Sequence, residues 1–412
     1  MATEDADADP RSASRGGENR RRDHEVAIVG AGAVGLTTAY DLARQGADVT
    51  VYERGAVASG SSGRAAGVCY SAFASRPDAT LGAEAIERFH AFASEGAPFT
   101  SCPYVWLAQR GDDQRIRLIQ DGIERMAELG VEAVELDTGE LAERFPTLQT
   151  DDVAIAGMTE QGGYTDPGEY TEWLASRVRD AGVTIREHTP VEIATDPPRV
   201  RFRDEQSKQT EQDVDTLVVA AGAHTKQILG DVGVPIAMKP YRVQALVGTV
   251  SVSEATRGTL GDNERATHWK PMWYDASAEC YARPHPDGLL AGNGTEEVEA
   301  DPDSYDRDAD DGFDTDLGAR VTHRMPDCTL DVQRAWAGLC TATPDRNPLV
   351  GKLRDSLYIA TGFQGQGFMR SPAIGRRLAD EILGGEGIEA FDPTRFDGDE
   401  EFDIREGMAI ES

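Results

Sequence analysis

The sequence predicts an α/β fold in which helices cover a parallel β-sheet, and three observations favour it. The chain has 412 residues, too many for one ordinary core, so two domains are expected. Residues 26–29 form a short, apolar, β-branched run of the kind found in buried parallel strands. A glycine-rich turn, a helical pattern that ends near residue 46, and a second strand at residues 48–52 follow in that order.

The glycine-rich turn has the spacing of a dinucleotide-binding fingerprint. Gly30 permits the tight turn, Gly32 lets the backbone approach a pyrophosphate, and Gly35 lets the helix pack closely on the strand. The helix begins around Ala33 and Val34, and its N-terminus offers free N–H groups and a positive dipole end to phosphates.

An acidic residue closes the second strand. Glu53 is placed to accept hydrogen bonds from ribose hydroxyls, and Arg54 follows it. Because strand, glycines, helix, second strand and acid occur in this order, we predict a dinucleotide site. The alternative is a glycine-rich turn in an unrelated α/β fold, and the motif itself leaves FAD and NAD open.

The segment directly after the second strand, residues 59–67, is rich in small residues. Small residues permit close contact with a flat, extended ligand, and the hydroxyls and the arginine suit phosphate or flavin oxygens. A flexible surface loop is the alternative. The residues expected at the ligand are Ser61, Ser62, Arg64, Ala65, Ala66 and Gly67.

The chain carries 73 acidic and 41 basic residues, a formal net charge of −32. Such a charge repels nucleic acid and anionic lipid, so neither is expected as a partner. The acids are spread along the whole chain, and concentrated salt screens their repulsion. We therefore interpret the composition as that of a protein from a salt-loving organism. No apolar run approaches the length of about 20 residues that a membrane span needs.

The five cysteines have no paired spacing, so neither a metal site nor a disulfide framework is expected, and the reducing cytoplasm fits best. Residues 1–22 are polar and charged and are expected to be disordered. Three arginines at residues 20–22 suggest a twin-arginine export signal, but Asp23 and His24 follow, and the next apolar run is the first strand. We therefore expect a cytoplasmic protein.

Further motifs resemble those of the D-amino-acid-oxidase-like flavoproteins, such as glycine oxidase, sarcosine oxidase and the flavin subunit of archaeal proline dehydrogenase. The resemblance runs from Glu25 to about Phe396. Beyond the fingerprint and the small-residue loop, the motifs occur in family order at residues 162–167, 190–191, 217–223, 281–284, 336–339, 343–351 and 357–369.

The resemblance implies FAD as the cofactor. Covalent sarcosine oxidases have a cysteine joined to the flavin where this chain has Gly338, so we expect non-covalent FAD. A helix opened by Pro372 and running to about Leu383 is expected to point its positive end at charge on the reduced flavin. The further residues implied at FAD are Val191, Ala221, Gly222, Gly338, Leu339, Gly362, Phe363, Gln364, Gly365, Gln366, Gly367, Phe368 and Met369.

The implied architecture is a Rossmann-like FAD-binding domain interleaved with an α+β substrate domain built on an antiparallel sheet. We expect the FAD-binding domain at residues 23–92, 152–236 and 329–396, the substrate domain at residues 93–151 and 237–328, and an acidic tail at residues 397–412.

The implied reaction is oxidation of the C–N bond of an amino acid or secondary amine by hydride transfer to flavin N5. Tyr281 and Arg283 lie two apart on a predicted strand and therefore face the same side. Tyr281 matches a family tyrosine at the substrate face. Arg283 suits either a bidentate contact to a substrate carboxylate or a structural pairing with an acid. Oxygen and a carrier both stay open as electron acceptor, as do homo- and hetero-oligomers.

The chain departs from the family pattern at the carboxylate-binding positions. Cys340 stands where glycine oxidase has its carboxylate-binding arginine, and Met369 where sarcosine oxidase has a lysine. A bulkier or cyclic amino acid is therefore open as substrate. Two other functions are also open: a 2-hydroxy acid dehydrogenase that oxidises a C–O bond, and a flavoprotein subunit or assembly factor without turnover of free small molecules.

Overall fold

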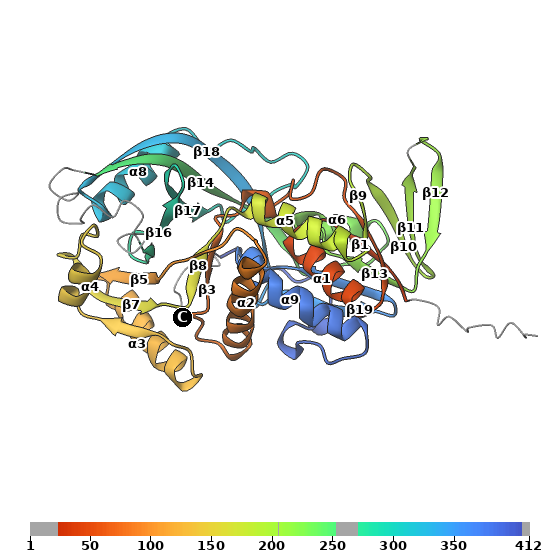
Figure 1. Ribbon diagram of the computed structural model, residues 1–412, viewed down its shortest axis with the longest axis horizontal. Helices are drawn as coiled ribbons and strands as arrows, with labels where there is room; N and C mark the ends of the chain where they lie inside the picture. The colour runs from red at the N-terminus through yellow and green to blue at the C-terminus, as the bar shows by residue number, and fades with distance from the viewer. Residues whose placement is uncertain (1–23, 205, 253–270, 406–412) are drawn as a thin grey trace, which may run out of the picture.

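The computed structural model describes residues 24–204, 206–252 and 271–405. The predicted disordered segment at residues 1–22 lies outside these ranges, as does the end of the predicted acidic tail from residue 406. Two large sheets lie at opposite ends of the molecule, with helices and a small sheet between them (Figure 1). This combination of parallel and antiparallel sheets with helices confirms the predicted fold class.

The first sheet has six strands in the order β19-β20-β13-β1-β2-β9. β1 pairs in parallel with β2 on one side and with β13 on the other. The pairs β13–β20 and β2–β9 are also parallel, and β19 is an antiparallel edge strand. The strands are β1 (Glu25–Val29), β2 (Asp48–Tyr52), β9 (Thr184–Arg186), β13 (Thr216–Val219), β19 (Leu349–Arg354) and β20 (Leu357–Thr361).

Alternation along β1 divides its side chains between two cores. Val26 and Ile28 belong to the core shared with the helical layer, whereas Ala27 and Val29 belong to the core shared with a three-stranded antiparallel sheet. The helices of the layer are α1 (Ala33–Arg44), α2 (Arg76–Ser94), α5 (Pro167–Asp180) and α9 (Gly367–Ile382), and the strands of the small sheet are β10 (Val191–Thr195), β11 (Pro198–Arg203) and β12 (Gln209–Asp213).

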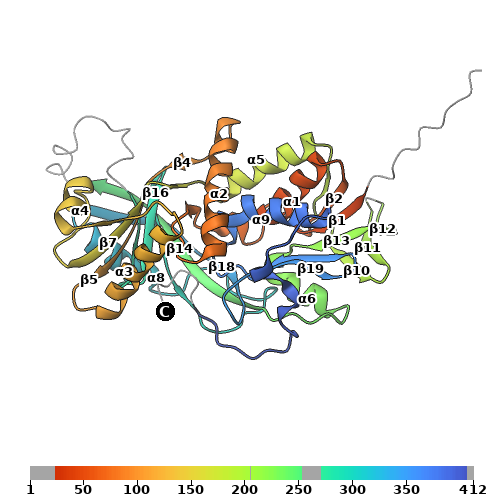
Figure 2. The same ribbon diagram turned by 90° about the horizontal axis from the view of Figure 1, so that it is seen from below.

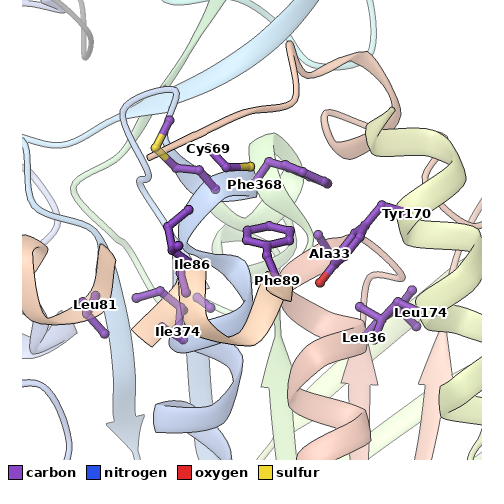
Figure 3. Packing of buried hydrophobic residues seen from close by; sticks show 14 of the residues in the cluster. Ala33, Leu36, Cys69, Leu81, Ile86, Phe89, Tyr170, Leu174, Phe368 and Ile374 are labelled. Atoms are coloured by element: carbon purple, nitrogen blue, oxygen red, sulfur yellow. The ribbon is translucent and has the colours of Figure 1, made fainter. Parts of the chain in front are cut away.

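Aromatic side chains fill the middle of the helical layer. Phe89 of α2 lies between Tyr170 of α5 and Phe368 of α9, with Ile86 and Ile374 nearby (Figure 3). Residues from three distant parts of the chain therefore share one core. α1 and α9 of this layer both begin at the functional site described below.

The second sheet has eight strands in the order β18-β14-β17-β16-β15-β5-β7-β6 and is antiparallel except for the pair β15–β5. Its long strands β14 and β18 extend toward the first sheet (Figure 2). The strands are β5 (Tyr104–Gln109), β6 (Val134–Leu136), β7 (Val153–Thr159), β14 (Lys239–Val252), β15 (Met272–Asp275), β16 (Cys280–His285), β17 (Gly288–Thr295) and β18 (Cys328–Ala342).

Smaller elements complete the described chain. Helices α3 (Asp113–Glu128), α4 (Thr138–Arg144) and α8 (Phe313–Arg324) lie around the eight-stranded sheet (Figure 1). A second small sheet joins β3 (Val68–Tyr70), β8 (Gly162–Tyr164) and β4 (Thr100–Ser101). The short helices are η1 (Ser62–Arg64), η2 (Gly222–His224), α6 (Thr225–Gly230), η4 (Glu389–Phe391) and η5 (Pro393–Arg395).

The division of the chain into an FAD part and a substrate part stays a prediction. Two strands show how closely the parts interleave. β7 and nearly all of β18 fall in segments assigned to the FAD part, yet both pair within the eight-stranded sheet.

Among the residues that the structure describes, no helix is long and apolar enough to cross a membrane.

The start of the last long helix differs from the prediction. We expected Pro372 to open it, but α9 begins at Gly367 and contains Pro372 in its interior. A proline there cannot donate to the carbonyl of Phe368 one turn earlier. The Ser371 hydroxyl donates to that carbonyl instead, at 2.8 Å, so the helix tolerates the proline.

The expected acidic tail also differs in its described part. Residues 397–405 pack back onto the protein: Ile404 is 3% exposed and contacts Tyr241 and Ala342. The Phe402 carbonyl accepts a hydrogen bond from Lys239 Nζ at 2.7 Å. This segment is therefore part of the folded structure in spite of its acidic composition.

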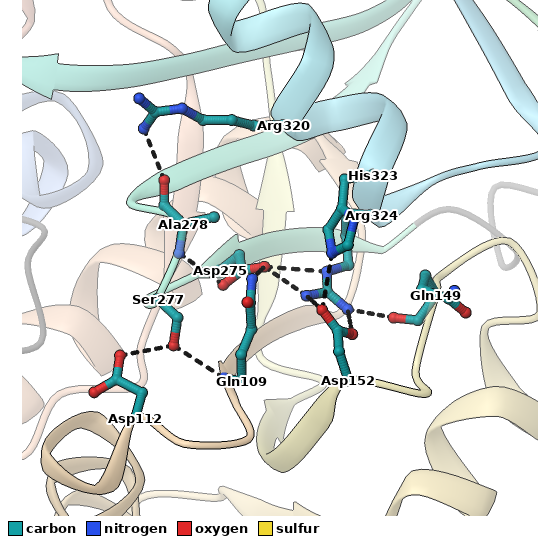
Figure 4. A network of polar contacts seen from close by, with 10 residues as sticks. All are labelled: Gln109, Asp112, Gln149, Asp152, Asp275, Ser277, Ala278, Arg320, His323 and Arg324. Carbon is teal, nitrogen blue, oxygen red and sulfur yellow. Dashed lines mark hydrogen bonds and ion pairs between the residues drawn. The ribbon is translucent and has the colours of Figure 1, made fainter.

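A buried polar network links α8 to the eight-stranded sheet (Figure 4). Arg324, at the end of α8, is 0% exposed and donates to Asp275 at 2.6 Å and to Asp152 at 2.9 Å. It also donates to the carbonyl of Gln149. Burial would raise the pKa of Asp152, but hydrogen bonds from His323 and Arg324 outweigh it and hold that pKa below its ordinary value. The network is thus built around one buried cation.

Candidate active site

A cavity of about 890 Å³ lies between the two sheets. The predicted ligand-binding segments meet around it, although they are far apart in the sequence. Of the predicted residues, those that line the cavity are Gly30, Gly32, Ala33, Val34, Glu53, Arg54, Ser61, Ser62, Arg64, Ala65, Ala66, Gly67, Val191, Ala221, Gly222, Tyr281, Gly338, Leu339, Phe363, Gln364, Gly365, Gly367, Phe368 and Met369. The lining does not include Gly35, Arg283, Gly362 or Gln366.

The glycine turn has the close approaches that its motif requires. Gly30 has φ +112°, and a Cβ there would lie 2.4 Å from the Ala220 carbonyl oxygen. A Cβ at Gly35 would lie 2.2 Å from the Gly30 carbonyl oxygen. Gly35 therefore serves the packing of α1 on β1 rather than a ligand contact, as the motif predicts.

The N-terminus of α1 opens into the cavity. Gly32 is the N-cap, and the first turn contains no acidic side chain. The hydroxyl of Ser62 accepts a hydrogen bond from the Ala33 N–H at 3.0 Å. Backbone N–H groups, a positive helix end and a cradle of small residues fit the pyrophosphate of a dinucleotide.

The Glu53 carboxylate is held at the end of β2. It accepts hydrogen bonds from the Ala31 N–H at 2.9 Å and the Gly55 N–H at 2.8 Å. The neighbouring Arg54 forms an ion pair with Asp303 at 2.9 Å. Glu53 is therefore preoriented at the position where the motif predicts a ribose.

The small-residue loop at residues 59–67 ties the two sheets together. Ser61 donates to the Leu339 carbonyl at 2.7 Å, and the Trp336 indole donates to the Arg64 carbonyl at 3.1 Å. Arg64 itself donates to the carbonyls of Ser59 and Gly60. These contacts show an ordered loop that closes the cavity between β2 and β18, instead of a flexible surface loop.

Arg283 lies behind this loop. It is 1% exposed, donates to the carbonyls of Ala66 and Pro284, and lies over the ring of Tyr164. Burial lowers the pKa of Arg283. This geometry favours the structural role of Arg283, because its guanidinium supports the cavity wall from outside.

The loop before α9 supplies another wall. The N–H groups of Gly362 and Phe363 donate to the Thr341 hydroxyl at 3.2 and 3.1 Å. Gln364 has φ +48°, accepts from the Thr343 N–H at 3.3 Å and donates to the Arg405 carbonyl at 3.2 Å. α9 then begins at the cavity with no acidic residue in its first turn.

One face of the eight-stranded sheet forms an uncharged wall of the cavity. Alternate residues of β14 face it, and the register places Tyr241 opposite Cys340 and Val243 opposite both Gly338 and Thr295. The Thr295 hydroxyl is buried, and among the described residues it has no hydrogen-bond partner. The uncharged residues of this wall are Tyr241, Val243, Gln244, Ala245, Tyr281, Asn293, Thr295, Trp336, Gly338, Leu339, Cys340 and Thr341.

Tyr281 occupies a space that a glycine leaves on the neighbouring strand. It pairs with Gly292, and a Cβ at Gly292 would lie 2.2 Å from the Tyr281 hydroxyl oxygen. The ring therefore lies flat over β17 at the edge of the cavity. The sequence analysis found Tyr281, Gly338 and Leu339 of this wall but missed Tyr241, Val243 and Ala245, although their period-two spacing was available as a signal.

A loop between β17 and α8 forms a further wall that sequence reasoning missed. Pro302, Asp303, Tyr305 and Arg307 of this loop line the cavity. Its sequence is acidic and lacks periodicity, so no signal distinguished it from a solvated surface loop.

Within the described part of the chain, no group of three His, Cys, Asp or Glu side chains could hold a metal ion.

The chain is similar to several known proteins. FAD-dependent oxidoreductase domain-containing protein 1 of Bos taurus is 26% identical over 410 residues, covering 88% of this chain and 81% of that protein. Glycine oxidase of Geobacillus kaustophilus is 25% identical over 383 residues, covering 87% of this chain and 93% of that protein. The solved structure of L-proline dehydrogenase from P. horikoshii has a TM-score of 0.78 at 26% identity and covers 90% of this chain and 97% of that chain.

Some curated relatives are much longer than this chain. The chain spans 55% of the length of one of them and 45% of the length of another. A family model described as FAD dependent oxidoreductase, DAO, matches residues 25–381. The match extends from β1 to α9 and so includes both sheets and nearly every wall of the cavity. The chain therefore belongs to the DAO family of FAD-dependent oxidoreductases.

Proposed function

We propose that this protein oxidises the C–N bond of an amino acid or secondary amine by hydride transfer to flavin N5. One observation carries the proposal: a single cavity joins the dinucleotide cradle at α1 to the uncharged wall that bears Tyr281 and Thr295. Similarity to a glycine oxidase and to an L-proline dehydrogenase supports an amine as the reacting group. Oxygen and a separate carrier are both compatible with this site as electron acceptor.

Bound FAD supplies a two-electron acceptor, and the chain supplies binding, orientation and exclusion of water. At the sheet wall, Tyr281, Thr295 and Cys340 are all uncharged. Such a wall does not stabilise an ammonium ion, so it favours the neutral amine from which a hydride can leave. Opposite, the N-terminus of α9 adds about 0.3–1 kcal/mol of stabilisation to negative charge that develops near it.

The carboxylate-binding positions of the family are uncharged in this chain. Cys340 lies on the sheet wall opposite Tyr241, and Met369 lies in the first turn of α9. Both side chains line the cavity. We therefore favour an amino acid with a larger or cyclic apolar part over glycine or sarcosine. A 2-hydroxy acid, or a role as a flavoprotein subunit, is the alternative that the next experiment separates.

Anaerobic reduction of the bound flavin tests the reaction. The purified protein is mixed with D- and L-amino acids, N-methyl amino acids, proline and 2-hydroxy acids one at a time, and absorbance is followed at roughly 450 nm, where oxidised flavins absorb. Bleaching by one amine class is expected, and readmitted air then separates an oxidase from a dehydrogenase. Bleaching by hydroxy acids alone contradicts C–N oxidation, and a yellow protein that no compound reduces favours the subunit role.

Tyr281→Phe is expected to raise KM for the best amine about fivefold to tenfold, because it removes one hydroxyl worth about 1–1.5 kcal/mol from the cavity edge. The affinity for FAD should stay unchanged. Steady-state kinetics and a flavin fluorescence titration measure the two effects. Tyr274→Phe is the matched control, because Tyr274 pairs with Tyr281 on β15 but is outside the cavity lining. Equal changes in both variants would show a structural effect.

A further inference from the structure

The loop that connects β17 to α8, residues 296–312, crosses from the eight-stranded sheet to the first sheet. We call it the strap. It carries nine acidic residues and a single basic one, Arg307. Four of its residues line the cavity. An acidic segment is repelled by the pyrophosphate of FAD, so its position over the cavity requires specific attachments.

One side of the strap is anchored to the eight-stranded sheet by Arg242. This arginine is 6% exposed and donates to the carbonyls of Asp306 at 2.9 Å and Asp308 at 2.5 Å. It also pairs with Glu296 and Asp310 at the two ends of the strap. Arg242 therefore holds the base of the strap in place.

Backbone hydrogen bonds reinforce the anchor. The Ala300 N–H donates to the Pro240 carbonyl at 2.8 Å, and the Ala337 N–H donates to the Arg307 carbonyl at 2.8 Å. Pro240 and Ala337 belong to β14 and β18, so the strap is tied to two of the strands that form the uncharged wall.

The other side of the strap is attached through Asp303. One of its carboxylate oxygens lies 2.9 Å from Arg54 Nη1 and 3.1 Å from His224 Nε2. Arg54 follows β2 of the first sheet and His224 ends η2, and both residues line the cavity. The hydrogen bond from Arg54 holds the pKa of Asp303 below its ordinary value, so the carboxylate is charged at neutral pH. Burial lowers the pKa of His224, which leaves Arg54 as the charged partner.

We propose that the strap closes over bound FAD and that Asp303 is its latch, a positioning residue that slows release of the cofactor by holding the strap against Arg54 and His224. The proposal rests on the FAD cofactor of the family and not on C–N oxidation. It is therefore tested on FAD release without any substrate, and the result is independent of the reaction that the enzyme performs.

The test compares FAD release from the wild type, Asp303→Asn and Glu299→Gln. Release is followed by flavin fluorescence after dilution of the holoprotein. Asp303→Asn is expected to release FAD about threefold to fivefold faster, near the upper end of what an exposed ion pair supplies. Glu299→Gln is the matched control, because it removes a strap ion pair to Lys226, which is outside the cavity lining. Its release rate should equal that of the wild type.

Salt gives a readout that a purely structural role of Asp303 would not produce. The side chains of Arg54 and Asp303 are 49% and 47% exposed, so dissolved ions reach the pair. At about 1 M KCl the Debye length is about 3 Å, and the ratio of release rates between Asp303→Asn and the wild type should fall toward one. Asp303→Glu, which keeps the charge, should release FAD more slowly than Asp303→Asn at low salt.

Three results would overturn the proposal: an unchanged release rate in Asp303→Asn, an equal acceleration in Glu299→Gln, or a rate ratio that does not depend on salt. If Asp303→Asn does not fold, Asp303→Ser provides a second uncharged variant with a residue common in loops, and the same expectations apply to it.

Discussion

Gly30→Ala is expected to weaken FAD binding by about 100-fold or more, which corresponds to at least ~2.7 kcal/mol. Gly30 has φ +112°, where an alanine is strained, and the added Cβ would lie 2.4 Å from the Ala220 carbonyl oxygen. The added Cβ and the Ala220 carbonyl oxygen cannot move apart independently of the backbone, because the Ala220 N–H is hydrogen-bonded to the Val29 carbonyl. The turn between β1 and α1 must shift, and the N–H groups at the start of α1 shift with it. Titration of the apoprotein with FAD measures the change.

Gly46→Ala is the control that separates the effect of the steric clash at residue 30 from the effect of a positive φ alone. Gly46 follows α1 and has φ +93°, and a Cβ added there would point into open space, with no contact within 4 Å. This variant should lose about 1–2 kcal/mol of stability for its left-handed conformation and keep its affinity for FAD. If both variants bind FAD equally well, the close approach of Gly30 to β13 is not needed for the site.

Contiguous sequence determines the parts of this structure that could be predicted. β1, the glycine turn, α1 and β2 follow one another within 28 residues, from Glu25 to Tyr52. Each has a local signal: an apolar strand, fixed glycine spacing or helical periodicity. β13 and Tyr281 on β16 were implied instead by the resemblance to known flavoproteins, through the motifs at residues 217–223 and 281–284. These segments were predicted without knowing which other segments lie beside them.

Of the three missed parts, one depends on a local contact and two depend on contacts between distant segments. Pro372 signals a helix start by itself, but α9 begins earlier because Ser371 satisfies the carbonyl that the proline leaves free. The strap is irregular and acidic, and its course depends on contacts to distant segments, such as those of Arg242 and Asp303. Arg283 was predicted to face the same side as Tyr281. The sequence of β16 does not reveal that the loop at residues 59–67 covers Arg283. For the strap and for Arg283, the deciding partner lies outside the segment that carries the signal, whereas the start of α9 depends on Ser371, directly before Pro372.

Arg324→Met is expected to lower the free energy of unfolding by about 3–5 kcal/mol, because it leaves two carboxylates without their buried cation. Asp275 is 1% exposed and loses its ion pair to Arg324 Nη2. Asp152 loses two hydrogen bonds from Arg324, which together with His323 hold its pKa below the ordinary value. Urea unfolding followed by circular dichroism measures the change. Arg320→Met, one turn earlier in α8, should lose only about 1–2 kcal/mol, since it removes an exposed ion pair to Asp316 and one hydrogen bond to the Ala278 carbonyl.

A second substitution shows whether the uncompensated charge is the cause. Asp275→Asn added to Arg324→Met removes the most deeply buried carboxylate, so the double variant should be more stable than Arg324→Met alone. If the double variant is less stable, the loss comes from packing around the Arg324 side chain instead. FAD affinity should be unchanged in all of these variants, because none of the network residues drawn in Figure 4 lines the cavity. A change in FAD affinity would instead show that this edge of the eight-stranded sheet is coupled to the uncharged wall.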